Sequence, residues 1–183
     1  MMDSPGEGPG EDYTAVFRRI LGRLASEQER ARDEGAAAAG LYDELMEMPG
    51  AEREPAIRGS ESFSSLALAG RLLDAGLEVR REDAEAGLEL SRLALAVAKR
   101  LAPGRYAPGL VADLRARCWA CLGDGWAKAD PTGARRAFRR ARRHLLRGSG
   151  DPLAEAEVLC LEAQLLEPAA AAGAAVGAPT RFH

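Results

Sequence analysis

The sequence has few of the residues on which most catalytic and metal sites depend. Its 183 residues include two histidines and three cysteines, and aromatic residues make up only 5%. A low, odd cysteine count gives no disulfide framework. Two histidines, one of them at the C-terminus, leave little for acid–base chemistry, and no glycine-rich loop is present to cradle a phosphate. We therefore expect no enzymatic activity, no cofactor and no bound metal.

Long apolar runs are also missing. No stretch reaches the length needed to span a bilayer. The first residues, MMDSPGEGPGED, lack the basic and apolar regions of a secretory signal. We expect a soluble, cytoplasmic protein in a reducing compartment, with no membrane partner.

What is abundant favours helices. Hydrophobic residues make up 46% of the chain, mostly alanine and leucine, while β-branched residues are scarce, so an all-α fold is expected.

The net charge of −3 gives no general affinity for nucleic acid. The charge is uneven, however, because residues 105–150 carry 11 basic and three acidic side chains and both flanking segments are acidic.

Composition divides the chain into four parts. Residues 1–12 are rich in Gly, Pro and acidic side chains and are expected to be disordered. Residues 13–61 are predicted to form an N-terminal helical extension. Residues 62–167 carry alternating helical patterns and short turns, and the Ala-rich tail, 168–183, is again expected to be disordered.

Within the extension, one helical segment is expected from Thr14, and a second over about 36–48. The breaker PGAEREP separates the second from the following domain. The first segment has apolar residues at helical spacing: Val16, Phe17, Ile20, Leu21 and Leu24.

The following domain is predicted to contain five helices. Asp130 and Asp151 can cap two of them, and Pro131 and Pro152 occupy the first helical position, where the missing N–H costs nothing. The expected ranges are 62–79, 84–101, 108–128, 132–147 and 152–167.

The stretch WACLGDGW has the spacing W-x2-L-G-x2-aromatic and is followed by A-x3-F. This pattern resembles the tetratricopeptide repeat, a pair of antiparallel helices. A degenerate second copy lies 47 residues earlier. The resemblance implies a short right-handed superhelix of helix pairs over residues 62–167. The residues that define the repeat are Trp119, Leu122, Gly123, Trp126, Ala134, Phe138 and Ala141.

The resemblance also implies a concave groove lined by the first helix of each pair. A groove with mixed charge suits a peptide or a helix from another protein. The positions of this sequence that match the groove of the family are Arg117, Ala120, Cys121, Asp124, Ala127 and Lys128. A clamp for a terminal carboxylate, found in some relatives, is not expected, because Ala120 and Asp124 depart from its pattern.

The helix expected over 132–147 carries seven arginines outside a narrow apolar stripe. One interpretation is a solvated face, partly paired with acidic residues of neighbouring segments. The other is a patch that binds phosphate or an acidic partner, although no aromatic residues are interleaved to stack on bases. These arginines are Arg135, Arg136, Arg139, Arg140, Arg142, Arg143 and Arg147.

Cys118 and Cys121 form a C-x2-C pair in CWAC. Zinc would need two further ligands, and Cys160, His144 and His183 do not have ligand spacing. A redox pair usually lies at a strand-to-helix junction, whereas this pair is predicted to be in the middle of a helix. Structural roles are therefore expected for both, with Cys121 partly exposed.

These observations favour a non-enzymatic interaction module: a scaffold, adaptor or regulatory subunit that binds another protein. Arrays of this kind in bacterial regulatory proteins point to signalling by analogy of fold. The alternative is a nucleic-acid-associated regulator that uses the arginine-rich helix. The first hypothesis predicts that charge reversal at Arg117 and Lys128 abolishes partner capture. A homodimer through helix 152–167 is a further hypothesis, based on Leu153, Val158, Leu161 and Leu165.

Overall fold

The computed structural model describes residues 10–175, and the side chains of residues 16–22, 25 and 28–164. Every regular element in this part of the chain is a helix, which confirms the all-α prediction. The isolated bridge between Pro103 and Tyr106 lies in the loop that precedes the fifth helix. The helices are α1 (Gly10–Glu47), α2 (Gly50–Gly59), α3 (Leu66–Val79), α4 (Ala84–Arg100), α5 (Pro108–Trp126), α6 (Pro131–Leu145) and α7 (Pro152–Ala175).

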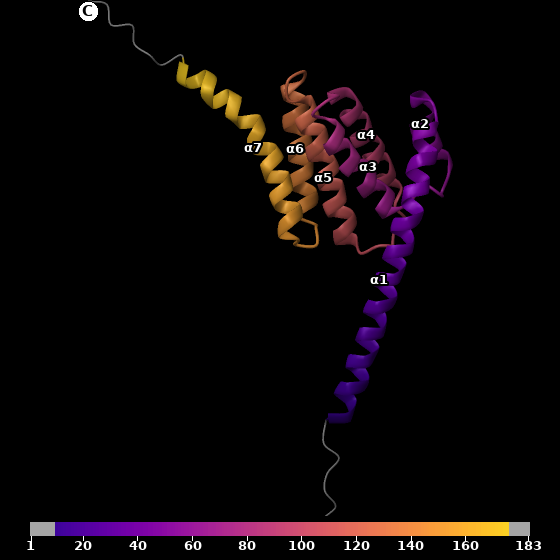
Figure 1. The fold of residues 1–183 in the computed structure, drawn as a ribbon. Coiled ribbons are helices and arrows are strands. Elements are labelled where there is room, and N and C mark those ends of the chain that lie inside the picture. Colours follow the sequence, from indigo (N-terminus) through magenta and orange to yellow (C-terminus); the bar gives the residue numbers. More distant parts are fainter. Residues whose placement is uncertain (1–9, 176–183) are drawn as a thin grey trace, which may run out of the picture.

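The helices stack in chain order (Figure 1). Helix α3 packs against α1 on one side and α5 on the other, and α5 packs against α7. Helices α2 and α4 also contact each other, while α4 pairs with α3 and α6 pairs with α5. The backbones of α4 and α6, both fully described, do not come into contact. Each helix pair therefore contacts mainly its neighbours along the chain.

The pairs α3/α4 and α5/α6 share small residues at equivalent positions, 47 residues apart in the sequence. A Cβ on Gly123 would lie 2.8 Å from Cε2 of Phe138, and a Cβ on Gly76 would lie 3.1 Å from the Gly87 carbonyl oxygen. Glycine at each position lets the second helix of the pair approach closely. The core of the second pair is therefore built on the same plan as that of the first, with Ser91 in place of Phe138.

The start of each second helix follows the predicted capping pattern. The Asp83 carboxylate accepts hydrogen bonds from the backbone N–H groups of Glu85 and Ala86, and the Asp130 carboxylate accepts one from Gly133. Each carboxylate satisfies N–H groups that have no partner within the helix. Pro131 occupies the first turn of α6, as expected.

The core runs through the stacked helices. Leu68 and Leu72 of α3, Val97 of α4 and Phe138 of α6 are at most 1% exposed. Burial of one such side chain contributes about 1.5–3 kcal/mol. The apolar stripe of each helix therefore fixes which of its faces is left for binding.

The N-terminal part differs from the sequence prediction. Residues 10–47 form one helix instead of two segments, because the intervening residues are good helix formers and include no proline. Apart from Pro49, which precedes the helix, the expected linker at 49–55 is helical and forms the start of α2. Ile57 of α2 is fully buried, and Arg53 donates to the carbonyl oxygens of Met46 and Met48. These tertiary contacts outweigh the cost of Pro55 inside the helix.

Two other boundaries also differ. Helix α3 begins at Leu66, not near residue 62, because the Ser65 hydroxyl caps it by accepting from the Leu68 N–H. Helix α7 continues to Ala175, past the expected end at 167, as the high helix propensity of alanine favours. Residues 10–12, expected to be disordered, belong to α1. Residues 1–9 and 176–183 lie outside the described part of the chain.

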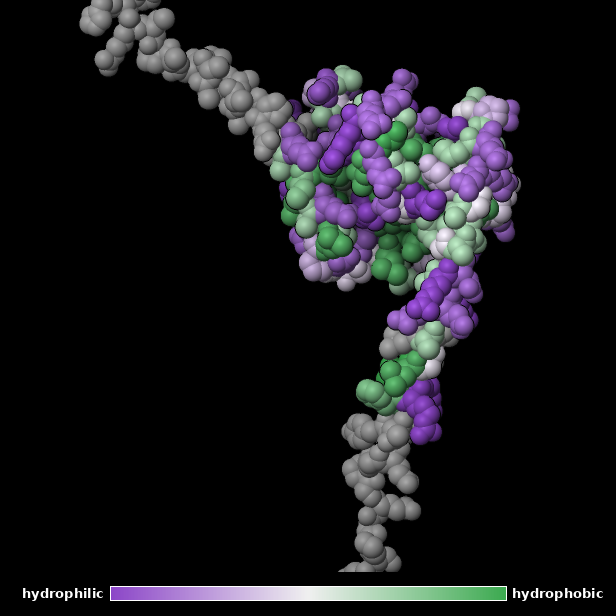
Figure 2. All heavy atoms as spheres, in the orientation of Figure 1, coloured by the Kyte–Doolittle hydropathy of each residue, from purple (hydrophilic) through white to green (hydrophobic). Residues whose placement is uncertain are grey.

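The N-terminal half of α1 projects from the stacked helices (Figure 1). Its apolar residues are exposed, with 44% of Val16, 65% of Phe17, 49% of Ile20 and 54% of Leu21 accessible to solvent. Hydrophobic residues are visible on this projecting part, whereas polar residues cover much of the stacked helices (Figure 2).

Candidate partner-binding groove and basic face

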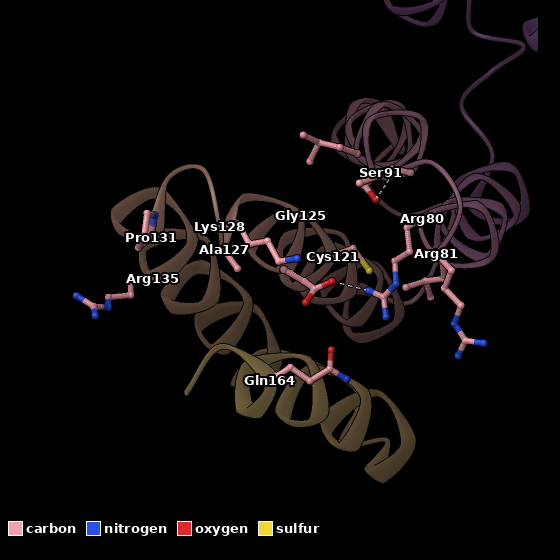
Figure 3. A pocket seen from close by; sticks show the side chains of 15 residues that line it. Arg80, Arg81, Ser91, Cys121, Gly125, Ala127, Lys128, Pro131, Arg135 and Gln164 are labelled. Atoms are coloured by element: carbon pink, nitrogen blue, oxygen red, sulfur yellow. Dashed lines mark hydrogen bonds and ion pairs between the residues drawn. The ribbon is translucent and has the colours of Figure 1, made fainter. Parts of the chain in front are cut away.

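A groove opens where the turn between α3 and α4 approaches α5 and α7. Its larger part has a volume of about 710 Å³, and an adjoining part of about 300 Å³ extends over α7. Leu77, Arg80, Arg81, Cys121 and Gln164 line both parts, so the two form one continuous surface. Figure 3 shows how these side chains and their neighbours surround the larger part.

An ion pair crosses the groove between the two helix pairs. Nη1 of Arg80 lies 2.7 Å from Oδ2 of Asp124, and both side chains are about three-quarters buried (Figure 3). Arg80 directly follows α3 and Asp124 belongs to α5, so this ion pair holds the α3 wall and the α5 wall of the groove together. Neither charge is free to meet a ligand unless the pair breaks.

A second ion-paired cluster closes the part of the groove that lies over α7. Arg117 of α5 donates from Nε to Glu157 of α7 at 2.5 Å and from Nη2 to Asp74 of α3 at 3.3 Å. Burial acts to lower the pKa of Arg117, but the two carboxylates outweigh burial and hold this pKa above its usual value. Arg117 therefore joins three helices and has a structural role besides lining the groove.

The rim of the larger part carries exposed cations. Arg81, Lys128 and Arg135 line this part and are exposed. None of the ion pairs among the described side chains involves them. The rim thus offers three positive charges that are not paired with any acidic side chain that the structure describes. Between them the surface is apolar, with Leu77 and Leu88.

The structure brings most of the predicted groove residues together. Cys121, Asp124, Ala127 and Lys128 line the larger part, and Arg117 lines the smaller one. Ala120 does not belong to the groove, contrary to the prediction: it is fully buried in the core and lines neither part.

Sequence reasoning missed the other wall of the groove. Arg80 and Arg81 follow α3, and Leu88 lies on α4, 30 or more positions before the recognised motif. The equivalence of positions 47 residues apart could have located them, since Leu77 and Arg81 correspond to Asp124 and Lys128.

The cysteine pair is buried. Cys118 is fully buried and Cys121 is 6% exposed, whereas Cys160 is exposed. The prediction of a partly exposed Cys121 is therefore wrong, because the side chain lies under Arg80 and Arg117 at the bottom of the groove. Burial raises the pKa of Cys121 to about 12, so its thiol is inert at neutral pH. No group of three or more potential metal ligands occurs among the described residues.

The arginine-rich helix α6 docks through a narrow stripe, as its pattern predicts. Ala134, Ala137, Phe138 and Ala141 are buried, and the arginines of α6 are exposed. Arg142 is bonded to Glu162 of α7 at 2.8 Å. Among the described side chains, no ion pair involves any of the others: Arg135, Arg136, Arg139, Arg140, Arg143 and Arg147.

The repeat-defining aromatic residue Trp119 lies beside this basic face. The guanidinium carbon of Arg140 is 4.5 Å from the centroid of its ring, and Nζ of Lys99 is 5.7 Å away. The two cations come from α6 and α4, so Trp119 lies between side chains of two helices whose backbones do not meet. Sequence reasoning found no aromatic residue within α6 and missed this one, which α5 supplies.

The remaining repeat-defining residues are core residues. Leu122, Ala134, Phe138 and Ala141 are at most 2% exposed, and Gly123 faces Phe138, while Trp126 packs at the edge of the core. In α7, Val158 and Leu161 are buried as well. These two are therefore not available for the dimer contact predicted through helix 152–167, whereas Leu153 is 66% exposed. The side chain of Leu165 lies outside the described residues.

In the part of the chain that the structure describes, no helix is long and apolar enough to cross a membrane. No protein-family model, no curated protein and no solved structure matches the chain.

Proposed function

We propose that this protein is a non-enzymatic interaction module, a scaffold, adaptor or regulatory subunit built on a tetratricopeptide-like superhelix. The stacking of helix pairs in chain order supports this proposal, as do the glycines and helix caps that recur at equivalent positions of α3/α4 and α5/α6. The pair α1/α2 precedes them in the stack, which lengthens the array beyond the two pairs found in the sequence.

The site of the proposed interaction is the groove, and the observation that carries it is the unpaired rim. Arg81, Lys128 and Arg135 surround an apolar surface formed by Leu77 and Leu88. A ligand that fits this arrangement has a few apolar side chains flanked by acidic ones. Apolar contacts supply most of the affinity of such an interface, while the rim charges increase the association rate and select the partner. The ligand is therefore an acidic, leucine-containing segment of another protein.

The structure also selects the residues for the test. Charge reversal at Arg117 is a poor test of ligand binding. Without the guanidinium group, Asp74 and Glu157 would lose their ion-pair partner and the fold would be destabilised. Arg81 and Lys128 are exposed and have no such structural role. The test variant is therefore R81E/K128E. The matched control is R136E/R139E, which reverses two exposed charges on the part of α6 that does not line the groove.

The experiment is selection of a random peptide library, displayed on phage, on the immobilised full chain. We expect the selected peptides to share acidic and leucine residues. They should bind the control variant as well as the wild type and should not bind the R81E/K128E variant. Selected peptides that bind R81E/K128E and the wild type equally would refute the groove as the binding site. A selection that yields no enriched sequence would refute the proposed ligand chemistry.

The second candidate is a nucleic-acid-associated regulator that uses α6, and the exposure of its unpaired arginines favours it. Arg136, Arg140 and Arg143 recur at intervals of three or four residues and so follow one side of α6, and Arg147 lies in the turn after it. Fluorescence anisotropy with labelled single- and double-stranded oligonucleotides tests this candidate. Binding that falls steeply with salt and disappears in R136E/R139E would support it. Absence of binding at low salt would exclude it.

A further inference from the structure

A third cavity lies in the gap between α4 and α6, where the backbones of the two helices do not meet. Its volume is about 330 Å³, and it shares no lining residue with the groove. Trp119 of α5 lines it together with one side chain from α4, three from α6 and one from the turn that follows α6. The full lining is Lys99, Trp119, Arg140, Arg143, His144 and Arg147.

All the charged groups that line this cavity are positive. Lys99, Arg140, Arg143 and Arg147 form no ion pair with any described acidic side chain, although five other arginines of the described chain do. Arg140 and Lys99 both lie against the ring of Trp119. Cation–π contacts compensate only part of the mutual repulsion of such a cluster.

The ends of the two helices do not account for the cluster. Lys99 is in the last turn of α4, and Arg143 and His144 are in the last turn of α6. Cations are favourable there, because a helix C-terminus carries about half a negative charge. Two such ends offset about one of the four cations. The cavity therefore keeps most of its positive charge, which a polyvalent anion could neutralise.

The environment of His144 is consistent with this excess. Burial lowers the pKa of His144, and Arg115, Arg147 and Arg143 lower it further, with no acidic group acting in the opposite direction. Arg115 donates two hydrogen bonds to the Ala98 carbonyl oxygen near the end of α4 and forms no ion pair with a described acidic side chain.

We propose that this cavity binds a compact phosphate anion with several negative charges, such as a di- or triphosphate group. Arginine guanidinium groups bind phosphate oxygens through paired hydrogen bonds, and lysine adds a point charge. The cations converge from α4 and α6 across a cavity, which fits a compact anion better than an extended nucleic-acid strand that would follow α6 along its length. This site is independent of peptide binding in the groove.

The test is isothermal titration of the full chain with sodium tripolyphosphate at constant ionic strength. The cavity variant is R140Q/R143Q/R147Q. Its matched control is R135Q/R136Q/R139Q, which removes the same charge from the same helix but leaves the cavity lining intact. We expect saturable binding of one anion per chain. Loss of three charge-assisted contacts should weaken it more than about tenfold in the cavity variant, and the control should change it by less than about threefold. Far-UV circular dichroism verifies that both variants are folded.

Other results would overturn the proposal. An equal loss in both variants would mean general electrostatic attraction to α6, and the absence of saturable binding would mean that no site exists. If an oligonucleotide binds to α6 and tripolyphosphate does not displace it, this face would be assigned to nucleic acid instead. A second measurement locates the anion: the ring resonances of His144 should shift on addition of tripolyphosphate, while those of the only other histidine, His183, should not. An unchanged His144 would also refute the proposal.

Discussion

The close contact between Gly123 and Phe138 gives a sharp test of how α5 and α6 are packed. A Cβ on Gly123 would lie 2.8 Å from Cε2 and 2.9 Å from Cδ2 of Phe138. Carbon atoms in favourable contact are about 3.5–4.0 Å apart, so the ring would have to move by most of an ångström. Phe138 is 1% exposed, and such a ring has no free space into which to move.

Two opposing effects set the magnitude for Gly123→Ala. Alanine favours the helix by about 1 kcal/mol over glycine, whereas overpacking of a tight core costs about 1–3 kcal/mol. We expect the packing cost to prevail, with a net loss of about 1 kcal/mol in the free energy of unfolding. In a Phe138→Leu background the clash is relieved, so the same Gly123→Ala change should stabilise the protein by up to about 1 kcal/mol. The coupling between the two positions is then about 2 kcal/mol.

The assay is urea unfolding followed by far-UV circular dichroism, with the free energy obtained by linear extrapolation. Gly40→Ala in α1 is the matched control, because nothing lies within 4 Å of a Cβ at that position. It should stabilise the protein by about 0.5–1 kcal/mol. The packing argument is refuted if Gly123→Ala has the same effect in the wild type as in the Phe138→Leu background.

Glu34, the three cysteines and His144 give three more tests, each based on the surroundings of the side chain. Burial raises the pKa of Glu34, but hydrogen bonds from Tyr106, Ser65 and the Ala67 N–H outweigh burial and leave this pKa below its usual value of 4.5. A lowered pKa stabilises the fold above the unfolded value and ceases to do so as pH falls through the folded one. Glu34→Gln should therefore cost about 1 kcal/mol at neutral pH and less in acid, measured by urea unfolding at both pH values. In native protein, a thiol reagent should modify the exposed Cys160 rapidly and the two buried cysteines only on unfolding, and rapid reaction of all three would contradict their burial. The pKa of His144, followed by NMR, should lie below 6.5 without added anion, and a value above it would contradict the all-cationic surroundings.

The sequence was sufficient to predict features that depend on local chemistry. Helix caps at Asp130 and Asp151, a proline at the start of α6 and a narrow apolar stripe on that helix all follow from residues close together in the chain. The structure has each of them. Helix propensity and capping act within a few residues, and this is why such predictions succeed.

Features that depend on tertiary packing were missed. Residues 50–55 of the expected linker are helical because Arg53 forms hydrogen bonds with carbonyl oxygens at the end of α1 and an ion pair with Glu89 of α4. The sequence pattern around Arg53 does not indicate these contacts. Ala120 was assigned to the groove from the family pattern, but in the folded protein it lies in the core. Trp119 was recognised as a repeat residue, yet the cations around it come from α4 and α6 and meet only in the folded protein.

The same distinction separates the arginines of the two surfaces. In the groove, Arg80 and Arg117 are each paired with carboxylates on other helices, so their charges hold the stack together. Around the cavity between α4 and α6, Arg140 and Arg143 have no such partner among the described side chains, and α6 is held in place by its apolar stripe. Charges retained at an electrostatic cost and without a structural partner are the ones expected to meet a ligand. Function should therefore depend on the unpaired cations, and stability on the paired ones.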